Sequence, residues 1–282
     1  MAPTAPPASL RIGKTLFKWG TRTYVMGVIN AAPDSFSGDG LLDAALAAER
    51  VCVMVEAGAE LIDVGAESMR PDAGTVDAGE EWARLGPALS AVRDAVDVPL
   101  SVDTVKAQVA ERALDAGADA VNDFNGLRED SQMASVIARR GCAAILMHNQ
   151  RGRSSSSDVI ADISVGLEES LRIAERAGID HELLILDPGL GFGWEVGQNL
   201  ELLARVGALR RLGRPLLIGT SRKSTIGALL NRPEGDRVWG TVATVALAVE
   251  AGIDIVRVHD VEQMVAVVRF PDAAVRLPGE TL

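Results

Sequence analysis

Short, uninterrupted apolar runs alternate along this chain with longer helical stretches. Runs that are apolar throughout, without polar alternation, are typical of strands buried on both faces, as in parallel sheets. We expect strands over residues 24–29, 60–64, 99–102, 118–121, 143–147, 183–186, 215–218 and 253–258. We expect helices over residues 42–57, 76–95, 105–116, 131–140, 160–177, 197–212, 223–230, 239–251 and 261–270.

Glycine follows several of the expected helices directly, at Gly58, Gly117, Gly141, Gly178 and Gly252. A glycine there can adopt the left-handed conformation that ends a helix. The pattern therefore contains eight strand–helix units, which is the size of an α/β fold of the (β/α)8 TIM barrel type. A doubly wound open sheet is the alternative, but no Gly-x-Gly-x-x-Gly motif follows the first strand.

We expect a single barrel domain over residues 21–275, preceded by a disordered or extended tail over 1–20 and followed by a tail over 276–282. The first ten residues lack the charged and apolar regions of a signal peptide. No apolar run approaches the roughly 18 residues that span a bilayer, so no membrane association is expected.

The composition narrows the possible partners and the compartment. The net charge of −11 argues against nucleic acid as a partner, because duplex binding needs a basic surface. The two cysteines, Cys52 and Cys142, both stand in apolar surroundings. Buried thiols in a reducing compartment, the cytoplasm, are the interpretation that this favours.

A polar or charged residue follows nearly every expected strand. One such residue alone is most often a turn former or a helix cap, but the repetition indicates an active site at the C-terminal rim of a barrel. The residues placed there are Asn30, Asp63, Asp103, Asn122, His148, Asp187, residues 220–223, Arg257 and His259.

The residue types at the rim suggest two subsites. Asp103, Asn122 and Asp187 suit a flat heterocycle rich in N–H donors, because a buried carboxylate can accept two parallel hydrogen bonds. The donors Arg257, His259 and Arg70 suit phosphate oxygens. Asn30 could hold Mg²⁺, which takes few protein ligands beside phosphates and waters. No P-loop, His-Glu-x-x-His or paired Cys-x-x-Cys motif is present.

Two loops combine Gly and Pro with charged residues, at residues 30–40 and 65–71. Loops of this composition after barrel strands are typical of segments that close over a site.

The strand-end motifs match a known family, in its order, over about residues 24–270. The chain resembles the dihydropteroate synthase family of pterin-binding barrels. The matching segments are residues 26–30 (MGVIN), 33–37 (PDSFS), 63–71, 101–104 (SVDT), 121–123 (VND), 146–148 (LMH), 187–193 (DPGLGFG), 219–224 (GTSRKS) and 256–260 (VRVHD).

The resemblance implies a homodimeric barrel enzyme that joins p-aminobenzoate to 6-hydroxymethyl-7,8-dihydropterin diphosphate, releasing 7,8-dihydropteroate and pyrophosphate. It also implies three groups of binding residues. The pterin would be held by Asp103, Asn122, Met147, Asp187, Gly219 and Lys223. The diphosphate would be held by Arg257, His259 and Asn30, the last through Mg²⁺. The p-aminobenzoate would be framed by Phe36, Arg70, Pro71, Phe192 and Ser224.

The chemistry of such a reaction agrees with these residue types. Loss of pyrophosphate from the pterin methylene leaves positive charge on a conjugated ring, so preorganised charges can stabilise both separating groups. Asp103, Lys223 and Arg257 are the residues to which we assign catalysis. An arylamine is a weak base that attacks without a dedicated general base, and we nominate none.

The loops depart from the family's usual sequence while the strand-end residues keep it. Ala31 and Ala32 replace Val-Thr, Gly38-Asp39 inverts Asp-Gly, and Met69 replaces a threonine. These changes keep a non-catalytic or weakly active paralogue as an alternative. A folate-dependent methyltransferase on a related barrel is a further alternative, although its substrate carries no diphosphate to match Arg257 and His259.

Overall fold

Eight parallel strands close into a barrel in the computed structural model, which describes residues 6–31, 44–67, 74, 76–155 and 157–276. The sheet order is β8-β7-β6-β5-β4-β3-β10-β9, and a parallel bridge from Leu186 to Leu216 joins its two ends. The strands are β3 Tyr24–Asn30, β4 Leu61–Gly65, β5 Leu100–Asp103, β6 Ala120–Asp123, β7 Ala143–Met147, β8 Leu184–Asp187, β9 Leu217–Ile218 and β10 Ile255–Val258. The predicted (β/α)8 TIM barrel is confirmed.

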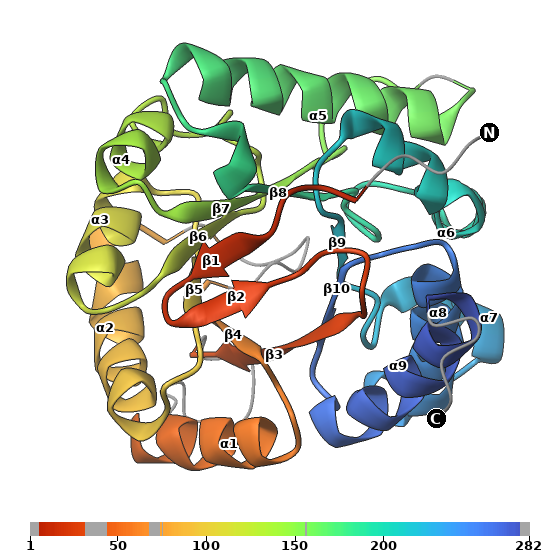
Figure 1. The fold of residues 1–282 in the computed structure, drawn as a ribbon, viewed down its shortest axis with the longest axis horizontal. Helices are drawn as coiled ribbons and strands as arrows, with labels where there is room; N and C mark the ends of the chain where they lie inside the picture. The colour runs from red at the N-terminus through yellow and green to blue at the C-terminus, as the bar shows by residue number, and fades with distance from the viewer. Residues whose placement is uncertain (1–5, 32–43, 68–73, 75, 156, 277–282) are drawn as a thin grey trace.

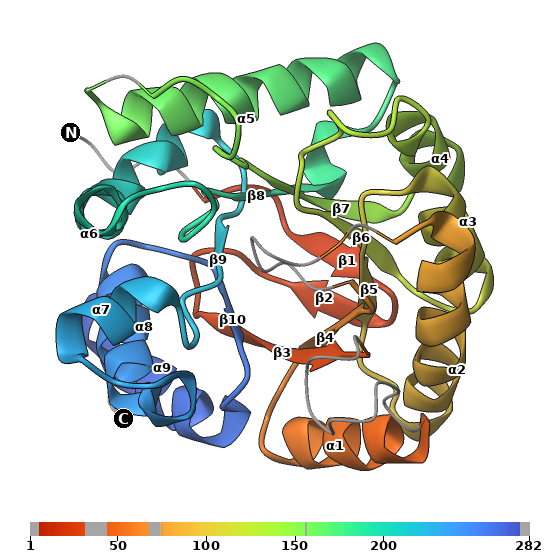
Figure 2. The same ribbon diagram turned by 180° about the vertical axis from the view of Figure 1, so that it is seen from behind.

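Helices surround the strands on the outside of the barrel (Figures 1 and 2). They are α1 Ala44–Glu56, α2 Ala78–Ala95, α3 Ala107–Asp115, α4 Met133–Arg140, α5 Val159–Arg176, α6 Val196–Arg205, α7 Ser224–Leu230, α8 Val238–Glu250 and α9 Val261–Val275. The five glycines expected after helices all have positive φ, between +58° and +108°, as the left-handed helix end requires. Among the described residues, no helix is long and apolar enough to cross a bilayer.

The predicted N-terminal tail is wrong for residues 10–17, which form an antiparallel hairpin. Strands β1 Leu10–Ile12 and β2 Thr15–Phe17 pair across Gly13 and Lys14, and Gly13 has a φ of +54°. Phe17 is fully buried, and its ring centroid lies 4.7 Å from that of Tyr24 at the start of β3. The alternation of Leu10, Arg11 and Ile12 before a glycine turn is the sequence signal for this hairpin.

The hairpin closes the N-terminal end of the barrel, where Figure 1 shows it lying across the ring of strands. Its apolar side chains pack on strand residues such as Leu61, Ala120, Ala143 and Ile255, each at or next to the start of its strand. A second, larger cluster fills the space between the strands and the outer helices. With the bottom of the barrel plugged, polar side chains have access to the interior from the C-terminal rim.

Two helices differ from the predicted ones for physical reasons, and the burial of the two cysteines differs as well. The helix expected over 197–212 changes at Val206 into a 3₁₀-helix, Val206–Leu212. Its Gly207 lies close to the C-terminal end of helix α8, where a Cβ on Gly207 would be 2.8 Å from the Ala251 carbonyl oxygen. Helix α9 continues past the expected end at residue 270, because buried Asp272 accepts hydrogen bonds from the amide and hydroxyl of Thr23. Cys52 and Cys142 are free thiols that are half-buried, where buried thiols were expected.

Candidate active site at the rim of the barrel

A cavity opens at the C-terminal ends of the strands, and we call it the central cavity. Its lining residues come from the ends of six strands, β5 to β10, and from the segments that follow them. They are Asp103, Asn122, Phe124, Met147, Asp187, Leu190, Phe192, Gly219, Lys223 and Arg257. All the residues predicted to hold a pterin are therefore brought together in one cavity.

Asp63 is the centre of the polar network below the central cavity. Its carboxylate is fully buried and accepts hydrogen bonds from the Ser101 hydroxyl, from Asn122 Nδ2 at 2.9 Å and from Arg257 Nε at 2.7 Å. Arg257 Nη2 donates to Asp103 Oδ2 at 2.8 Å. One guanidinium is thus shared by two buried carboxylates, which fixes the orientation of Arg257, Asn122 and Asp103 before any ligand binds.

Asp103 carries an unmet acceptor at this site. Its Oδ1 atom is buried and has no hydrogen-bond partner among the described residues. Burial raises the pKa of Asp103 well above its ordinary value, the nearby Asp63 carboxylate raises it further, and Arg257 opposes both. A ligand N–H donor at Oδ1 would satisfy the orphaned oxygen and favour the ionised carboxylate.

Asp187 and Lys223 face each other across the same cavity. Burial raises the pKa of Asp187 to about 6, although its Oδ1 accepts the Gly189 N–H at 2.7 Å. Burial lowers the pKa of Lys223 to about 8, with Asp187 acting against that shift. Lys223 Nζ lies 4.4 Å from the ring centroid of Phe192, and its stem packs on Gly191, where a Cβ would lie 3.0 Å from Lys223 Cδ.

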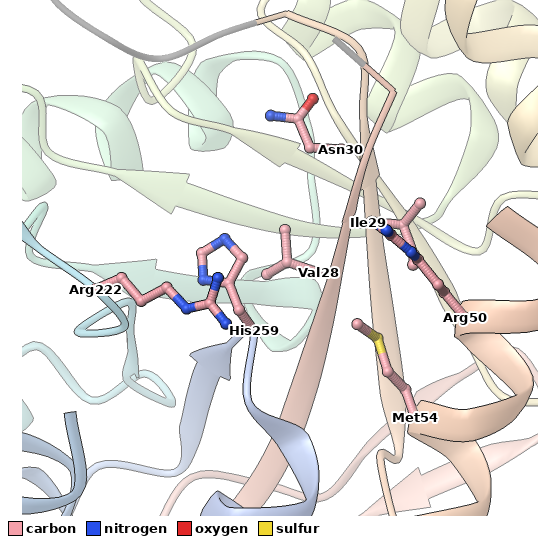
Figure 3. Close-up of a pocket in the computed structure, with 7 residues that line it drawn as sticks. All are labelled: Val28, Ile29, Asn30, Arg50, Met54, Arg222 and His259. Atoms are coloured by element: carbon pink, nitrogen blue, oxygen red, sulfur yellow. The ribbon is translucent and has the colours of Figure 1, made fainter. Parts of the chain in front are cut away.

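A second cavity lies beside β3, and we call it the side cavity. Figure 3 shows its lining residues: Val28, Ile29, Asn30, Arg50, Met54, Arg222 and His259. The His259 ring is held through Nδ1 by the Ser221 hydroxyl at 3.0 Å. Burial, followed by the charges of Arg257 and Arg222, lowers the pKa of His259 to about 4, so this imidazole is neutral near pH 7.

The two cavities are neighbours because the chain turns sharply between Arg222 and Lys223. Arg222 has a φ of +57°, an uncommon conformation for a residue with a side chain, and it sends Arg222 to the side cavity and Lys223 to the central one. A bidentate ion pair holds this turn, with Arg222 Nε and Nη2 at 3.1 and 2.6 Å from the Asp260 carboxylate oxygens. This pairing gives Arg222 a structural role in the turn.

The other predicted site residues do not all lie in one cavity. Arg257 and His259, expected at one diphosphate, line different cavities. Ser224 is exposed at the start of α7. Phe36, Arg70 and Pro71 lie outside the described residues.

His148 follows β7 but turns away from the rim toward helix α5. A Cβ on Gly166 of that helix would lie 2.0 Å from His148 Nδ1, so only glycine leaves room for the ring. Its Nε2 contacts Gln150 Oε1 at 2.9 Å, and burial lowers its pKa to about 4. This is a structural histidine.

The strand-end pattern did not reveal the central role of Asp63 below the central cavity, the apolar walls Phe124 and Leu190, or Arg50 and Met54 on helix α1. Phe124 and Leu190 stand within three residues of strand ends and could have been found from that position. Arg50 lies in the middle of helix α1, away from any strand end.

A divalent cation fits this donor set only together with a phosphate ligand. Asn30 offers the side cavity an amide oxygen, whereas the described lining residues include two arginines and no carboxylate. Within the described residues, no group of three or more His, Cys, Asp and Glu side chains could hold a metal alone. A Mg²⁺ ion takes most of its ligands from phosphates and water in sites of this kind.

Comparison with known proteins decides the family of this chain. The sequence model of the pterin binding enzyme family matches residues 26–259. A dihydropteroate synthase from Synechocystis is 43% identical over 275 residues, covering 95% of each chain. The chain belongs to the dihydropteroate synthase family. It is therefore a transferase of folate biosynthesis.

Solved structures of dihydropteroate synthases share the whole barrel. The enzyme from Clostridium difficile, crystallised in the presence of pteroic acid, has a TM-score of 0.89 and 43% identity, covering 92% of this chain and 99% of its own. The enzyme from Xanthomonas albilineans with 4-aminobenzoic acid also has a TM-score of 0.89, at 37% identity, covering 95% and 98%. The small-molecule ligands named for these relatives are of the kinds expected for the dihydropteroate synthase reaction.

Proposed function

We propose that the central cavity holds the dihydropterin ring of 6-hydroxymethyl-7,8-dihydropterin diphosphate and that the side cavity holds its diphosphate. The observation that carries this proposal is the orphaned Asp103 oxygen, which faces a cavity also lined by Asn122, Asp187 and Lys223. Carboxylates beside an amide and a cation complement a ring edge that alternates N–H donors with a carbonyl acceptor. Met147 and Phe124 supply apolar contacts for the ring faces.

The reaction breaks the bond between the pterin methylene carbon and a diphosphate oxygen and forms a bond from that carbon to the p-aminobenzoate nitrogen. The amine proton leaves to solvent or to the departing pyrophosphate. Asp103 and Asp187 stabilise the positive charge that develops on the ring, and the cationic groups stabilise the leaving oxygen. We assign no nucleophile and no general base.

The p-aminobenzoate subsite lies beside Lys223 in this proposal. Phe192 lines the central cavity with Arg151 and Lys223 near its ring, and Ser224 opens α7 directly after Lys223. Phe36, Arg70 and Pro71 complete the subsite from the two loops, as the family resemblance implies. The enzyme from Xanthomonas albilineans carries 4-aminobenzoic acid in its crystal structure, which supports an arylamine substrate here.

We also propose Mg²⁺ as the cofactor, held between Asn30 and the diphosphate. When bound, Mg²⁺ would supply charge neutralisation to the leaving group. The amide oxygen of Asn30 and the neutral His259 imidazole line the same cavity as uncharged polar groups.

The rate constant kcat/KM for the pterin diphosphate is expected to follow a bell-shaped pH profile with limbs near pH 6 and pH 8. Asp187 accepts hydrogen bonds best as an anion, and it gains a proton as the pH falls through its pKa of about 6. Lys223 loses its positive charge as the pH rises through its pKa of about 8. Steady-state rates measured from about pH 5 to pH 9 check both limbs.

A Lys223→Arg variant separates the lysine from other causes of the alkaline limb. Its guanidinium stays protonated throughout this range, so the residual activity should lose the limb near pH 8. The assignment is wrong if the wild-type profile is flat, or if Lys223→Arg keeps the same alkaline limb.

Growth of a folate-auxotrophic strain lacking its own synthase tests the proposed activity in cells. Expression of this chain is expected to restore growth, and a Lys223→Ala variant expressed at the same level is not. Calorimetry distinguishes the alternatives, since a synthase binds the pterin diphosphate and a methyltransferase binds methyltetrahydrofolate. Binding of the pterin without rescue of growth would support a non-catalytic paralogue.

We further propose that the enzyme is a homodimer formed through helices α7, α8 and α9, which lie side by side in Figures 1 and 2. Large apolar side chains are exposed on these helices, with Trp239 77% and Phe270 83% accessible. Leu229, Leu230 and Leu247 are also at least 50% exposed there. Exposed apolar side chains gathered in this way mark an interaction surface. We place the dimer in the cytoplasm, where Cys52 and Cys142 would stay reduced.

The homodimer is tested by sedimentation velocity. The wild-type protein is expected to sediment as a dimer, and a Trp239→Glu/Phe270→Glu variant as a folded monomer, because burying two carboxylates in an apolar interface is unfavourable. Val165→Glu on helix α5 is the matched control, since Val165 is 58% exposed on another face and should leave the dimer intact. A monomeric wild type, or a dimeric double variant, rejects this interface.

A further inference from the structure

Arg50 lines the side cavity from helix α1, on the wall opposite Arg222 and His259 (Figure 3). It lies one helical turn before Met54, so the two side chains share one face of α1. Arg50 is half-buried, which keeps its guanidinium at the cavity rather than in bulk solvent. No role in the reaction has been assigned to it so far.

Helix α1 reaches the cavity because β3 carries a glycine at the point of contact. A Cβ on Gly27 would lie 2.9 Å from Met54 Sδ and 3.0 Å from Ile62 Cδ1, so a larger residue would displace the Met54 side chain that lines the cavity beside Arg50. Val28 and Ile29, which follow Gly27, line the same cavity. Helix α1 and β3 thus form one wall of the side cavity together.

The electrostatics of the side cavity depend on its arginines. His259 is neutral near pH 7 because burial lowers its pKa to about 4, and Asn30 carries no charge. Arg222 already donates from Nε and Nη2 to Asp260, so part of its charge and two of its donors hold the turn before Lys223. A diphosphate carries more negative charge than Arg222 can balance alone, and Arg50 is the second guanidinium among the described residues of this lining, with a planar fork that matches phosphate oxygens.

We propose that Arg50 binds the diphosphate of the substrate and retains the pyrophosphate product, from the wall opposite Arg222. This inference rests on the proposed function, in which the side cavity is the diphosphate subsite. It makes Arg50 a specificity-determining residue, which favours the diphosphate over pterins that end in a hydroxymethyl group. Binding of the pterin ring in the central cavity does not depend on it.

Calorimetry with inorganic pyrophosphate and Mg²⁺ tests the proposal without turnover. Arg50→Gln is expected to weaken pyrophosphate binding about 10- to 100-fold, the effect of losing one or two charge-assisted hydrogen bonds. The pyrophosphate affinity of Arg50→Lys should lie between those of Arg50→Gln and the wild type, because lysine keeps the positive charge and loses the planar fork of donors. Arg172→Gln on α5 is the control for net charge, since Arg172 is 56% exposed on an outer helix, and it should bind as the wild type does.

Pteroate binding, measured on the same variants, separates a local effect from a damaged fold. Arg50→Gln should bind pteroate as tightly as the wild type, and in turnover it should raise the KM for the pterin diphosphate while the KM for p-aminobenzoate stays constant. Wild-type pyrophosphate affinity in Arg50→Gln overturns the inference. An equal loss of pteroate and pyrophosphate binding also overturns it, because it would make Arg50 a structural residue.

The failure of this inference is distinguishable from failure of the proposed function. A wild-type protein that makes dihydropteroate, with an Arg50→Gln variant that binds pyrophosphate normally, rejects Arg50 alone. A wild-type protein that makes no dihydropteroate, yet binds pyrophosphate through Arg50, rejects the synthase activity and keeps the anion site.

Discussion

Replacement of Asp103 by asparagine is expected to lower kcat/KM for dihydropteroate formation by at least about a hundredfold, the usual effect of removing a preorganised charge. The orphaned Oδ1 atom of Asp103 is the acceptor that we assign to the pterin N–H groups. An asparagine side chain is neutral and would meet those donors with an amide in place of a carboxylate. Steady-state kinetics with both substrates measure the loss, which Lys223→Ala should match in size.

The same substitution should leave the protein at least as stable as the wild type. Burial and the Asp63 carboxylate both raise the pKa of Asp103, so its negative charge is unfavourable in the unliganded fold. Arg257 retains Asp63 as its ion-pair partner. Urea unfolding of Asp103→Asn therefore separates a catalytic loss from a folding loss. Asp97→Asn, with a side chain 89% exposed, is the control. Asp103→Asn at wild-type rates would refute the role of Asp103.

Replacement of Arg257 by glutamine is expected to lower the free energy of unfolding by about 3 to 5 kcal/mol, the typical cost of breaking a buried ion pair from one side. Arg257 donates to Asp63 at 2.7 Å and to Asp103 at 2.8 Å, and Asp63 is fully buried. Without the guanidinium, two carboxylates that repel each other remain below the central cavity. Urea denaturation at neutral pH measures this loss.

A second substitution identifies the cause of that instability. The Asp63→Asn/Arg257→Gln double variant removes one of the two unpaired carboxylates and should recover part of the lost stability. Activity should stay low in both variants, because the group that orients Asp103 is absent. A drop of less than about 1 kcal/mol in Arg257→Gln would mean that the shared guanidinium contributes little to the fold.

The positions of most pterin-binding candidates could be predicted from sequence because a barrel brings the C-terminal ends of all its strands together at one rim. Asp103, Asn122 and Asp187 each end a short apolar strand, and closure of the sheet brings those ends to one rim. The strand limits were accurate for the same reason, since buried parallel strands are apolar throughout. His148 shows where this rule stops: it follows β7 directly, yet the glycine at position 166 lets it point outward.

The features that the sequence concealed depend on packing between distant segments. The hairpin over residues 10–17 is stabilised by contacts of Phe17 with the bottom of the barrel, and the proline-rich start of the chain obscured it. The separation of the rim into two cavities follows from the left-handed turn at Arg222. The sequence does not predict this turn, because the residue that adopts it is an arginine and not a glycine. Arg50 reaches the site from helix α1, which packs beside β3 with Met54 against Gly27.

The fold buries two ionisable side chains of the site, Asp187 and Lys223, although burial disfavours their charged forms. Burial shifts the pKa of Asp187 upward and that of Lys223 downward, so both groups are held in surroundings that favour their neutral forms. A bound pterin would supply the hydrogen bonds that compensate this desolvation. We therefore expect pterin binding to raise the thermal stability of the protein, as for any ligand that binds the native state alone.

The most direct measurement is the reaction itself, with purified protein, 6-hydroxymethyl-7,8-dihydropterin diphosphate, p-aminobenzoate and Mg²⁺. Dihydropteroate and pyrophosphate should form in equal amounts, and omission of p-aminobenzoate should stop dihydropteroate formation. A folded wild-type protein that binds the pterin diphosphate and yet forms neither product would contradict the proposed synthase activity.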